Sequence, residues 1–314
     1  MTARGRRRAS VVAGDGEGQQ EQDDDGAVEA AAAAVGVSAV ELHLAAGHAR
    51  TAELLRRGGA ADDLVAAHLL LAEPGGEGWR VDALRQAARA TRGRGAPEIT
   101  ATYLRRALRE PVSVEERGPL LLELGKDEMQ VDLGAARHYL TQASTALTDP
   151  YARAEAAYLL GNALFLSHEH EGAVDVLARA VEDLQQIDNG SGLAREVSWF
   201  LQAQMLLIGY DRMATLPAAQ RHARLLWDHK LAGETPGECA VLAALSAWAV
   251  TGAASASVTD DLLDRAMRGG LAAVDTSQML VSLAGLAFVA TDRLDDAGAQ
   301  FDHIADVGGR WARS

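Results

Sequence analysis

Three stretches of the sequence align with one another: Tyr103-Leu104-Arg105-Arg106-Ala107-Leu108, Tyr139-Leu140-Thr141-Gln142-Ala143-Ser144 and Val176-Leu177-Ala178-Arg179-Ala180-Val181. The leucine that they share recurs after 36 and then 37 residues. This is the period of one helix-turn-helix unit in proteins made of stacked helical repeats. The repeat predicts an all-α chain, and we expect a right-handed α-solenoid of about five to six helix pairs.

Each repeat also places a glycine and a leucine at matching positions. Gly125 precedes Leu140 much as Gly161 precedes Leu177. A glycine allows the first helix of a pair to approach the second closely, and the leucine then fills the groove between them. Both units therefore look like tetratricopeptide repeats.

Helices are predicted along the rest of the chain as well, at less regular spacing. A hydrophobic fraction of 48% with only 4% aromatic residues favours closely packed helices of Ala, Leu and Val. Asp149-Pro150 and Thr235-Pro236 are typical helix starts. We expect helices over 40–57, 62–72, 193–208, 216–230, 236–251, 258–267 and 279–289, the last followed by a helix that carries Ala297, Phe301 and Ile304 at the repeat offsets.

Composition excludes several classes of function. A net charge of −14 argues against nucleic-acid binding along the chain, because neutralising phosphates requires a basic face. The single cysteine, Cys239, excludes an internal disulfide framework and a Cys-based zinc finger. No apolar run reaches the roughly 18 to 20 residues that span a bilayer. We therefore expect a cytoplasmic protein without membrane contact.

The sequence divides into three regions. Residues 1–26 join an arginine cluster to glycine and acidic residues, which predicts a disordered tail; a basic arm that binds nucleic acid is the alternative. Residues 27–74 are expected to form a helical segment, and residues 75–314 the tetratricopeptide-like repeats. Gly190-Ser191-Gly192 is interpreted as a linker, because it lacks the full pattern of a nucleophile elbow.

One known family resembles this chain over about residues 42–310. The resemblance is carried, in order, by His48–Leu55, Val65–Leu71, Trp79–Ala88, Gly95–Glu98, Tyr103–Leu108 and Glu115–Gly125. These segments resemble the large ATP-dependent LuxR-type regulators, actinobacterial relatives of the maltose regulator. Residues 27–74 look like the end of the ATPase module of that family, and the following segments look like its helical repeats.

The resemblance implies a transcriptional regulator. In that family a P-loop ATPase binds nucleotide, a tetratricopeptide-like superhelix senses inducers or partner proteins, and a C-terminal helix-turn-helix binds DNA. Here Gly125-Lys126 is followed by Asp127 and makes no phosphate loop, and no recognition-helix unit follows Val307. We therefore expect a fragment that contains no cofactor site, with ATP bound only in the absent module, and that can self-associate through uncapped ends. A free-standing tetratricopeptide adaptor for protein assembly is the alternative, and no spacing of polar residues predicts an enzyme.

Three tryptophans are the candidate site. Trp199, Trp227 and Trp248 fall on successive predicted helices, where they could line a groove for a small effector or a partner helix. The alternative is that they fill gaps in an alanine-rich core.

Other chemistry-bearing residues are interpreted as structural. His168-Glu169-His170-Glu171 could bind a metal, but it is expected to be a turn, because ligands two apart on a helix point away from each other. His43, His48 and His68 are expected to pack or to form hydrogen bonds. Cys239 lies near a helix start, which favours the thiolate, but the neighbouring Glu234 and Glu238 oppose a redox role. We predict no catalytic and no metal-binding residue.

Overall fold

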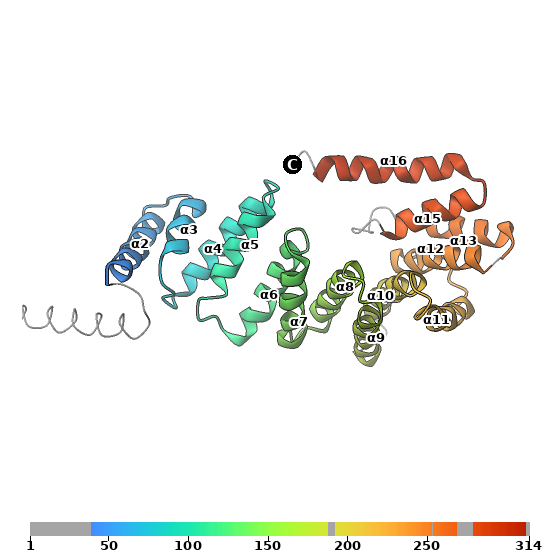
Figure 1. Ribbon diagram of the computed structural model, residues 1–314, viewed down its shortest axis with the longest axis horizontal. Coiled ribbons are helices and arrows are strands. Elements are labelled where there is room, and N and C mark those ends of the chain that lie inside the picture. The colour runs from blue at the N-terminus through green and yellow to red at the C-terminus, as the bar shows by residue number, and fades with distance from the viewer. Residues whose placement is uncertain (1–38, 188–191, 253, 269–278, 312–314) are drawn as a thin grey trace, which may run out of the picture. The chain divides into compact units, whose positions relative to one another are not determined.

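The computed structural model describes residues 39–187, 192–252, 254–268 and 279–311 (Figure 1). These residues form fourteen helices joined by turns, and they contain no strand. The predicted all-α class is therefore confirmed for the described part of the chain. The predicted tail over 1–26 lies outside the described residues.

The chain divides into two compact units, one ending at Gly75 and one beginning at Gly76. The described part of the first unit is a pair of packed helices, α2 (Ala39–Arg57) and α3 (Asp62–Leu71). Gly59, with a φ of 71°, stands in the turn between them, where a left-handed backbone favours glycine.

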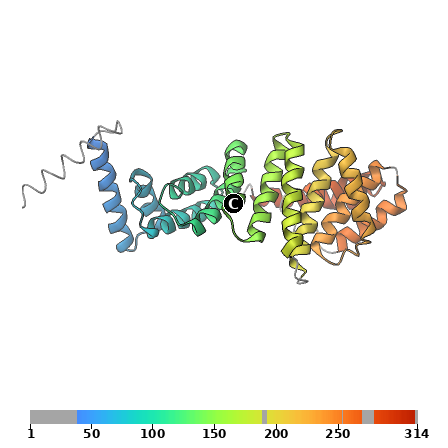
Figure 2. The ribbon, with the colours of Figure 1, turned by 90° about the horizontal axis from the view of Figure 1, so that it is seen from below.

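The second unit is a series of helices that each pack against the next helix along the chain. The elements are α4 (Gly78–Arg92), α5 (Pro97–Ala107), α6 (Val114–Glu128), α7 (Leu133–Ala146), α8 (Pro150–Leu166), α9 (His170–Ile187), α10 (Leu193–Tyr210), α11 (Leu216–Asp228), α12 (Pro236–Thr251), α13 (Ala256–Arg268), α15 (Met279–Ala290) and α16 (Leu294–Trp311). The helices α6, α8, α10, α12 and α15 also contact one another in that order. Figures 1 and 2 both show α6 to α10 side by side.

The helix starts follow the predicted capping signals. The Asp149 carboxylate accepts a hydrogen bond from the Ala152 amide at 2.9 Å, at the start of α8. Thr235 caps α12 in the same way, with its hydroxyl accepting from the Glu238 amide at 3.3 Å. Each cap satisfies an amide that the helix itself leaves without a partner.

The predicted contact between glycine and a large side chain recurs in three helix pairs: Gly125 with Leu140 (α6 and α7), Gly161 with Leu177 (α8 and α9) and Gly285 with Phe301 (α15 and α16). A methyl group added at Gly125 would lie 2.6 Å from Leu140 Cγ, and one added at Gly161 would lie 3.1 Å from Leu177 Cγ. Helices therefore approach so closely at these points that a side chain on the first helix would meet the second.

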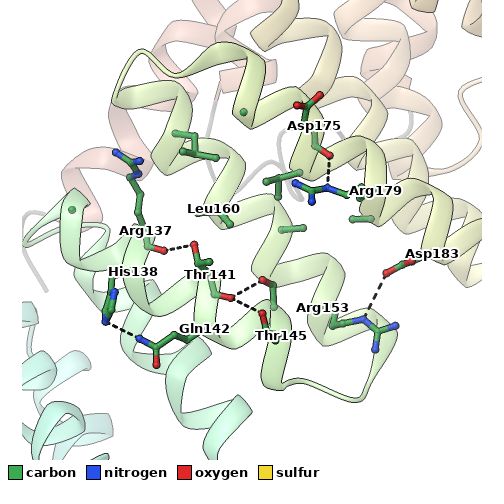
Figure 3. Close-up of a pocket in the computed structure, with 17 residues that line it drawn as sticks. Arg137, His138, Thr141, Gln142, Thr145, Arg153, Leu160, Asp175, Arg179 and Asp183 are labelled. Atoms are coloured by element: carbon green, nitrogen blue, oxygen red, sulfur yellow. Dashed lines mark hydrogen bonds and ion pairs between the residues drawn. The ribbon is translucent and has the colours of Figure 1, made fainter.

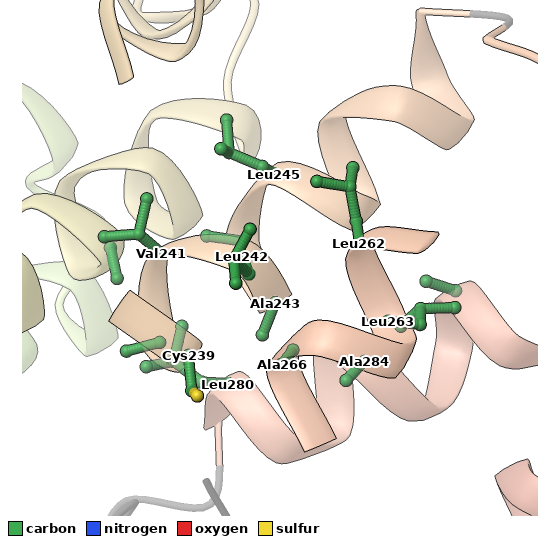
Figure 4. Close-up of a cluster of buried hydrophobic side chains, with 14 of the residues drawn as sticks. Cys239, Val241, Leu242, Ala243, Leu245, Leu262, Leu263, Ala266, Leu280 and Ala284 are labelled. Carbon is green, nitrogen blue, oxygen red and sulfur yellow. The ribbon is translucent and has the colours of Figure 1, made fainter. Parts of the chain in front are cut away.

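Two apolar clusters form the core of the second unit from α6 onward, and α10 contributes to both. Leu201 and Ile208 face the cluster that α6 to α9 build, whereas Ala203 and Leu206 face the cluster of α11 to α16. The helix α12 is enclosed by its neighbours, with every residue from Cys239 to Leu245 at most 2% exposed (Figure 4). Among the helices that the structure describes, none is both long enough and apolar enough to cross a bilayer.

Ion pairs join helices of the second unit near its beginning. Arg92 of α4 donates two hydrogen bonds to Asp127 of α6, at 2.8 and 2.6 Å. Arg105 of α5 pairs with the buried Glu128 of α6 at 2.6 Å. Burial raises the pKa of Glu128, and the Arg105 charge opposes that rise. These ion pairs hold α4 and α5 to α6 at places where alanine side chains bury little apolar surface area.

Candidate functional site

A groove of about 810 Å³ lies between α7 and α9, with α8 as its floor (Figure 3). We call it the α7–α9 groove. Its floor is apolar, because α8 presents Ala157, Leu160 and Leu164 to it. Polar side chains of α7 and α9 form most of its walls, and three arginines line it: Arg137 of α7, Arg153 of α8 and Arg179 of α9.

The local sequence explains the groove. The helix α8 packs against α7 on one side and α9 on the other, because its buried residues occur on more than one face. Asp132 starts α7 by accepting hydrogen bonds from the Gly134 and Ala135 amides at 2.8 and 3.1 Å. The two wall helices thus stand on a common apolar helix, and their polar faces line the space between them.

The three arginines differ in how their guanidinium groups are engaged. Arg137 is paired with Glu169 through both terminal nitrogens, at 2.6 and 3.0 Å. Arg153 donates to the Thr148 carbonyl at 3.0 Å, and its Nε lies 3.7 Å from the Asp183 carboxylate.

Arg179 stands apart from the other two arginines. Its Nε donates to the Asp175 carbonyl of its own helix at 3.2 Å. Within the described residues, its two terminal nitrogens make no hydrogen bond or ion pair. The exposed guanidinium therefore keeps donors available for an anion that enters the groove.

Hydroxyl groups on α7 add acceptors to the same groove. Thr141 donates to the Arg137 carbonyl at 2.7 Å, and Thr145 donates to the Thr141 carbonyl at 3.2 Å. Ser144 also donates to the Thr141 carbonyl, at 2.9 Å. Because each hydroxyl proton is used within the helix, the oxygen lone pairs face outward as acceptors. The groove thus combines cationic donors, neutral acceptors and an apolar floor.

The predicted tryptophan site is placed on three successive helices, α10, α11 and α12. Trp227 and Trp248 pack edge to face with ring centroids 5.5 Å apart, and Trp199 packs in the same way on His229 at 5.2 Å. All three contact the apolar cluster of α11 to α16, so they do fill the core. Trp199 also lines a small cavity of about 360 Å³ with Ser198. Binding of an effector or partner by these rings stays a prediction.

The histidines take structural positions. Of the four residues predicted to form a turn, His168 and Glu169 lie between α8 and α9, and His168 has a φ of 63°, whereas His170 and Glu171 already belong to α9. His170 Nε2 lies 2.6 Å from Asp211 Oδ2 at the end of α10. In the first unit, His48 Nδ1 and His68 Nδ1 lie 2.9 Å apart in a hydrogen bond, so each of these two histidines is hydrogen-bonded as expected, although their pairing was not predicted.

No group of three or more His, Cys, Asp or Glu side chains in the described residues is arranged to hold a metal ion. Cys239 is buried in the core, with its Sγ 3.5 Å from the Gly233 carbonyl and 3.7 Å from the Arg265 carbonyl. Gly125 and Lys126 lie within α6, as expected, rather than in a phosphate-binding loop.

The sequence patterns do not single out the groove arginines. The chain contains 30 basic residues, and all but two of the lysine and arginine side chains are arginine, so arginine on a helix face carries little information. The groove also depends on side chains from three helices, and no local motif records that convergence.

Comparisons with known proteins assign no family. No protein-family model matches the chain, and no curated protein matches it. The resemblance to ATP-dependent LuxR-type regulators therefore rests on the residues of the sequence alone.

Proposed function

We propose that this chain is a tetratricopeptide-like α-solenoid that binds a partner protein on its helix surfaces. The observation that carries the proposal is the recurring contact of glycine with a large side chain, in three helix pairs of a unit where each helix packs on the next. Packing mainly between helices near one another in sequence leaves long polar surfaces exposed, and repeat proteins use such surfaces for binding.

We also propose that the partner surface belongs to a LuxR-type, ATP-dependent transcriptional regulator. The resemblance of residues 42–310 supports this assignment. The mechanism would be indirect: a ligand or partner would shift the packing between neighbouring repeats and so alter contacts to the ATPase module. The close contact of Gly161 with Leu177 supports this mechanism, because a tightly packed helix pair transmits a shift instead of absorbing it.

Photo-crosslinking tests the proposal. Benzoylphenylalanine would replace Thr145, an exposed residue of the α7–α9 groove, or Arg224, an exposed residue of α11, in the full chain in cells of its source organism. We expect an adduct with a protein whose purified form binds the purified chain. Adducts at neither position would contradict the proposal.

The identity of the partner separates the two versions of the function. A partner, or a neighbouring open reading frame, with a P-loop ATPase or a helix-turn-helix supports the regulator. A partner that lacks both supports a free-standing adaptor.

A further inference from the structure

We infer that a small cavity between α9, α10 and the end of α11 binds a small, flat, uncharged molecule with an N–H group next to a carbonyl, that is, a cyclic amide. We call this space the α9–α10 cavity. Its volume is about 360 Å³, and its lining includes Ser198, Trp199, Gln202 and His229. The inference goes beyond the proposed partner binding and does not depend on it.

Two buried polar side chains of α10 line the cavity and are only partly satisfied. Ser198 is 4% exposed and Gln202 is 9% exposed. Gln202 Nε2 donates a hydrogen bond to Ser198 Oγ at 3.0 Å. Within the described residues, the Gln202 carbonyl oxygen accepts no hydrogen bond, and the Ser198 hydroxyl proton is donated to no acceptor. Buried polar groups without partners are unfavourable, so a molecule that satisfies both groups is stabilised in the cavity.

The sequence places these two groups side by side. Ser198 and Gln202 are four residues apart on α10, so they are neighbours on one face of the helix. That face meets the end of α9 and His229, which directly follows α11. The Gln202 carbonyl offers an acceptor, and the Ser198 hydroxyl next to it offers a donor. The N–H and C=O groups of an amide present the complementary pair.

Two rings give the cavity flat walls. Trp199 and His229 both line it, with ring centroids 5.2 Å apart and ring planes at 75° to each other. A flat ligand can stack on one ring and present its edge to the other, which are the two arrangements that aromatic groups prefer. Leu184 and Ala194, each 1% exposed, add an apolar surface. These walls favour a ring over a flexible chain.

Charge and size narrow the ligand further. Of the described residues that line the cavity, Arg195 is the only lysine, arginine, aspartate or glutamate, and it is exposed. An ion beside the neutral Ser198 and Gln202 would therefore lack a buried counter-charge, which disfavours a charged ligand. The volume lies near the lower end of the roughly 300–1,000 Å³ that is usual for ligand sites. A molecule of one or two rings fits these limits.

Water alone would occupy this cavity less favourably. An ordered buried water makes about two to four hydrogen bonds, and the side chains of Leu184 and Ala194 offer none. Water over these walls is poorly ordered, and its displacement by the apolar face of a ring increases affinity.

Saturation-transfer NMR titrations test the inference with the full chain. The probe is uracil, a flat cyclic amide. The control ligand is N,N′-dimethyluracil, which has the same ring but no N–H group. The variants are Gln202→Leu and Ser198→Ala, and Gln220→Leu is the matched control, because Gln220 is exposed on α11 and does not line the cavity.

We expect uracil to bind with a dissociation constant between about 10 μM and 1 mM, as suits so small a ligand. Gln202→Leu should weaken binding about tenfold, because a hydrogen bond in a buried site is lost. Ser198→Ala should weaken it severalfold, and Gln220→Leu should change it less than about twofold. N,N′-dimethyluracil should bind about tenfold more weakly than uracil, and Gln202→Leu should not weaken it further.

Stability separates a ligand-binding role of Gln202 from a structural one. Circular-dichroism melts of Gln202→Leu without ligand should show a melting temperature equal to or above that of the unsubstituted chain, since the substitution removes an unpaired carbonyl from a buried place. A lower melting temperature would indicate that Gln202 is structural, and it would count against the inference.

Three binding results would overturn the inference: no binding of uracil at about 10 mM, equal binding of uracil and N,N′-dimethyluracil, or equal effects of Gln202→Leu and Gln220→Leu. Without uracil binding, water alone meets Ser198 and Gln202. If Gln202→Leu does not fold, the comparison of the two ligands and Ser198→Ala still decide. Photo-crosslinking decides the proposed function separately, because it reports on partner proteins at other surfaces.

Discussion

The contact between Gly125 and Leu140 makes a quantitative prediction about the repeat. In Gly125→Ala, the new methyl would lie 2.6 Å from both Cγ and Cδ2 of Leu140, about 1 Å closer than the usual 3.5–4.0 Å between carbon atoms. Leu140 is fully buried and packs among Ala136 and Ala143, so it cannot move aside without displacing the core.

The size of the effect follows from two opposing terms. Overpacking a filled core costs about 1–3 kcal/mol. Replacing a helical glycine by alanine returns about 0.4–1 kcal/mol, because the unfolded chain loses freedom. Gly172→Ala in α9 isolates the second term, since its methyl would meet only Leu164 Cδ1, at 3.9 Å. Gly125→Ala should therefore be less stable than Gly172→Ala by about 1–3 kcal/mol.

Urea denaturation followed by far-ultraviolet circular dichroism measures this difference. Gly161→Ala should fall between the two variants, because its methyl would lie 3.1 Å from Leu177 Cγ and a small shift would relieve the contact. Leu140→Ala should remove the penalty of Gly125→Ala in the double variant, although it is destabilising alone by about 2–5 kcal/mol. Equal stability of Gly125→Ala and Gly172→Ala would refute the close helix approach.

Three further predictions concern buried polar and aromatic residues. Arg105→Gln should destabilise the chain by about 1–3 kcal/mol at pH 7, because Glu128 loses its partner. This loss of stability should shrink near pH 5, since burial raises the pKa of Glu128 and favours its neutral form. A loss of stability that does not change with pH in urea titrations would count against this reasoning. Burial lowers the pKa of His222 from its ordinary 6.5, so the unfolded chain takes up the proton first and the melting temperature should fall as pH drops through 6.5. That fall should be smaller in His222→Leu, and an identical pH profile would contradict the assignment. Trp227→Ala should cost about 2 kcal/mol through lost packing on Trp248, measured by urea denaturation, whereas a neutral effect would favour a role of this ring on the surface.

Much of the fold could be predicted from the sequence because its causes are local. The predicted range 236–251 coincides with α12, and 193–208 differs from α10 only at its end. Caps such as Asp149 bond to amides three residues away, so their effect is visible in a short window. The pairing of Gly125 with Leu140 was also predictable, because a fixed repeat period places the same residue types at the same helix contact in each repeat.

The candidate site could not be predicted in the same way. Arg179 and Arg106 occupy one repeat position and are chemically identical, yet one is buried in an ion pair and the other faces a groove. The difference arises from Arg153, which lies on another helix and faces the carboxylate of Asp183. No sequence pattern within a single helix shows that Arg153 and Arg179 compete for the carboxylate of Asp183.

The sequence by itself determined the helices, their ends and the close contacts within helix pairs, since these depend on local propensity and on a regular period. The tertiary structure decided which charges are satisfied and which remain available, and it also packed Trp199, Trp227 and Trp248 against the core. The physical reason is that an ion pair or a groove requires side chains from separate helices to meet, and their distances are set only when the helices pack.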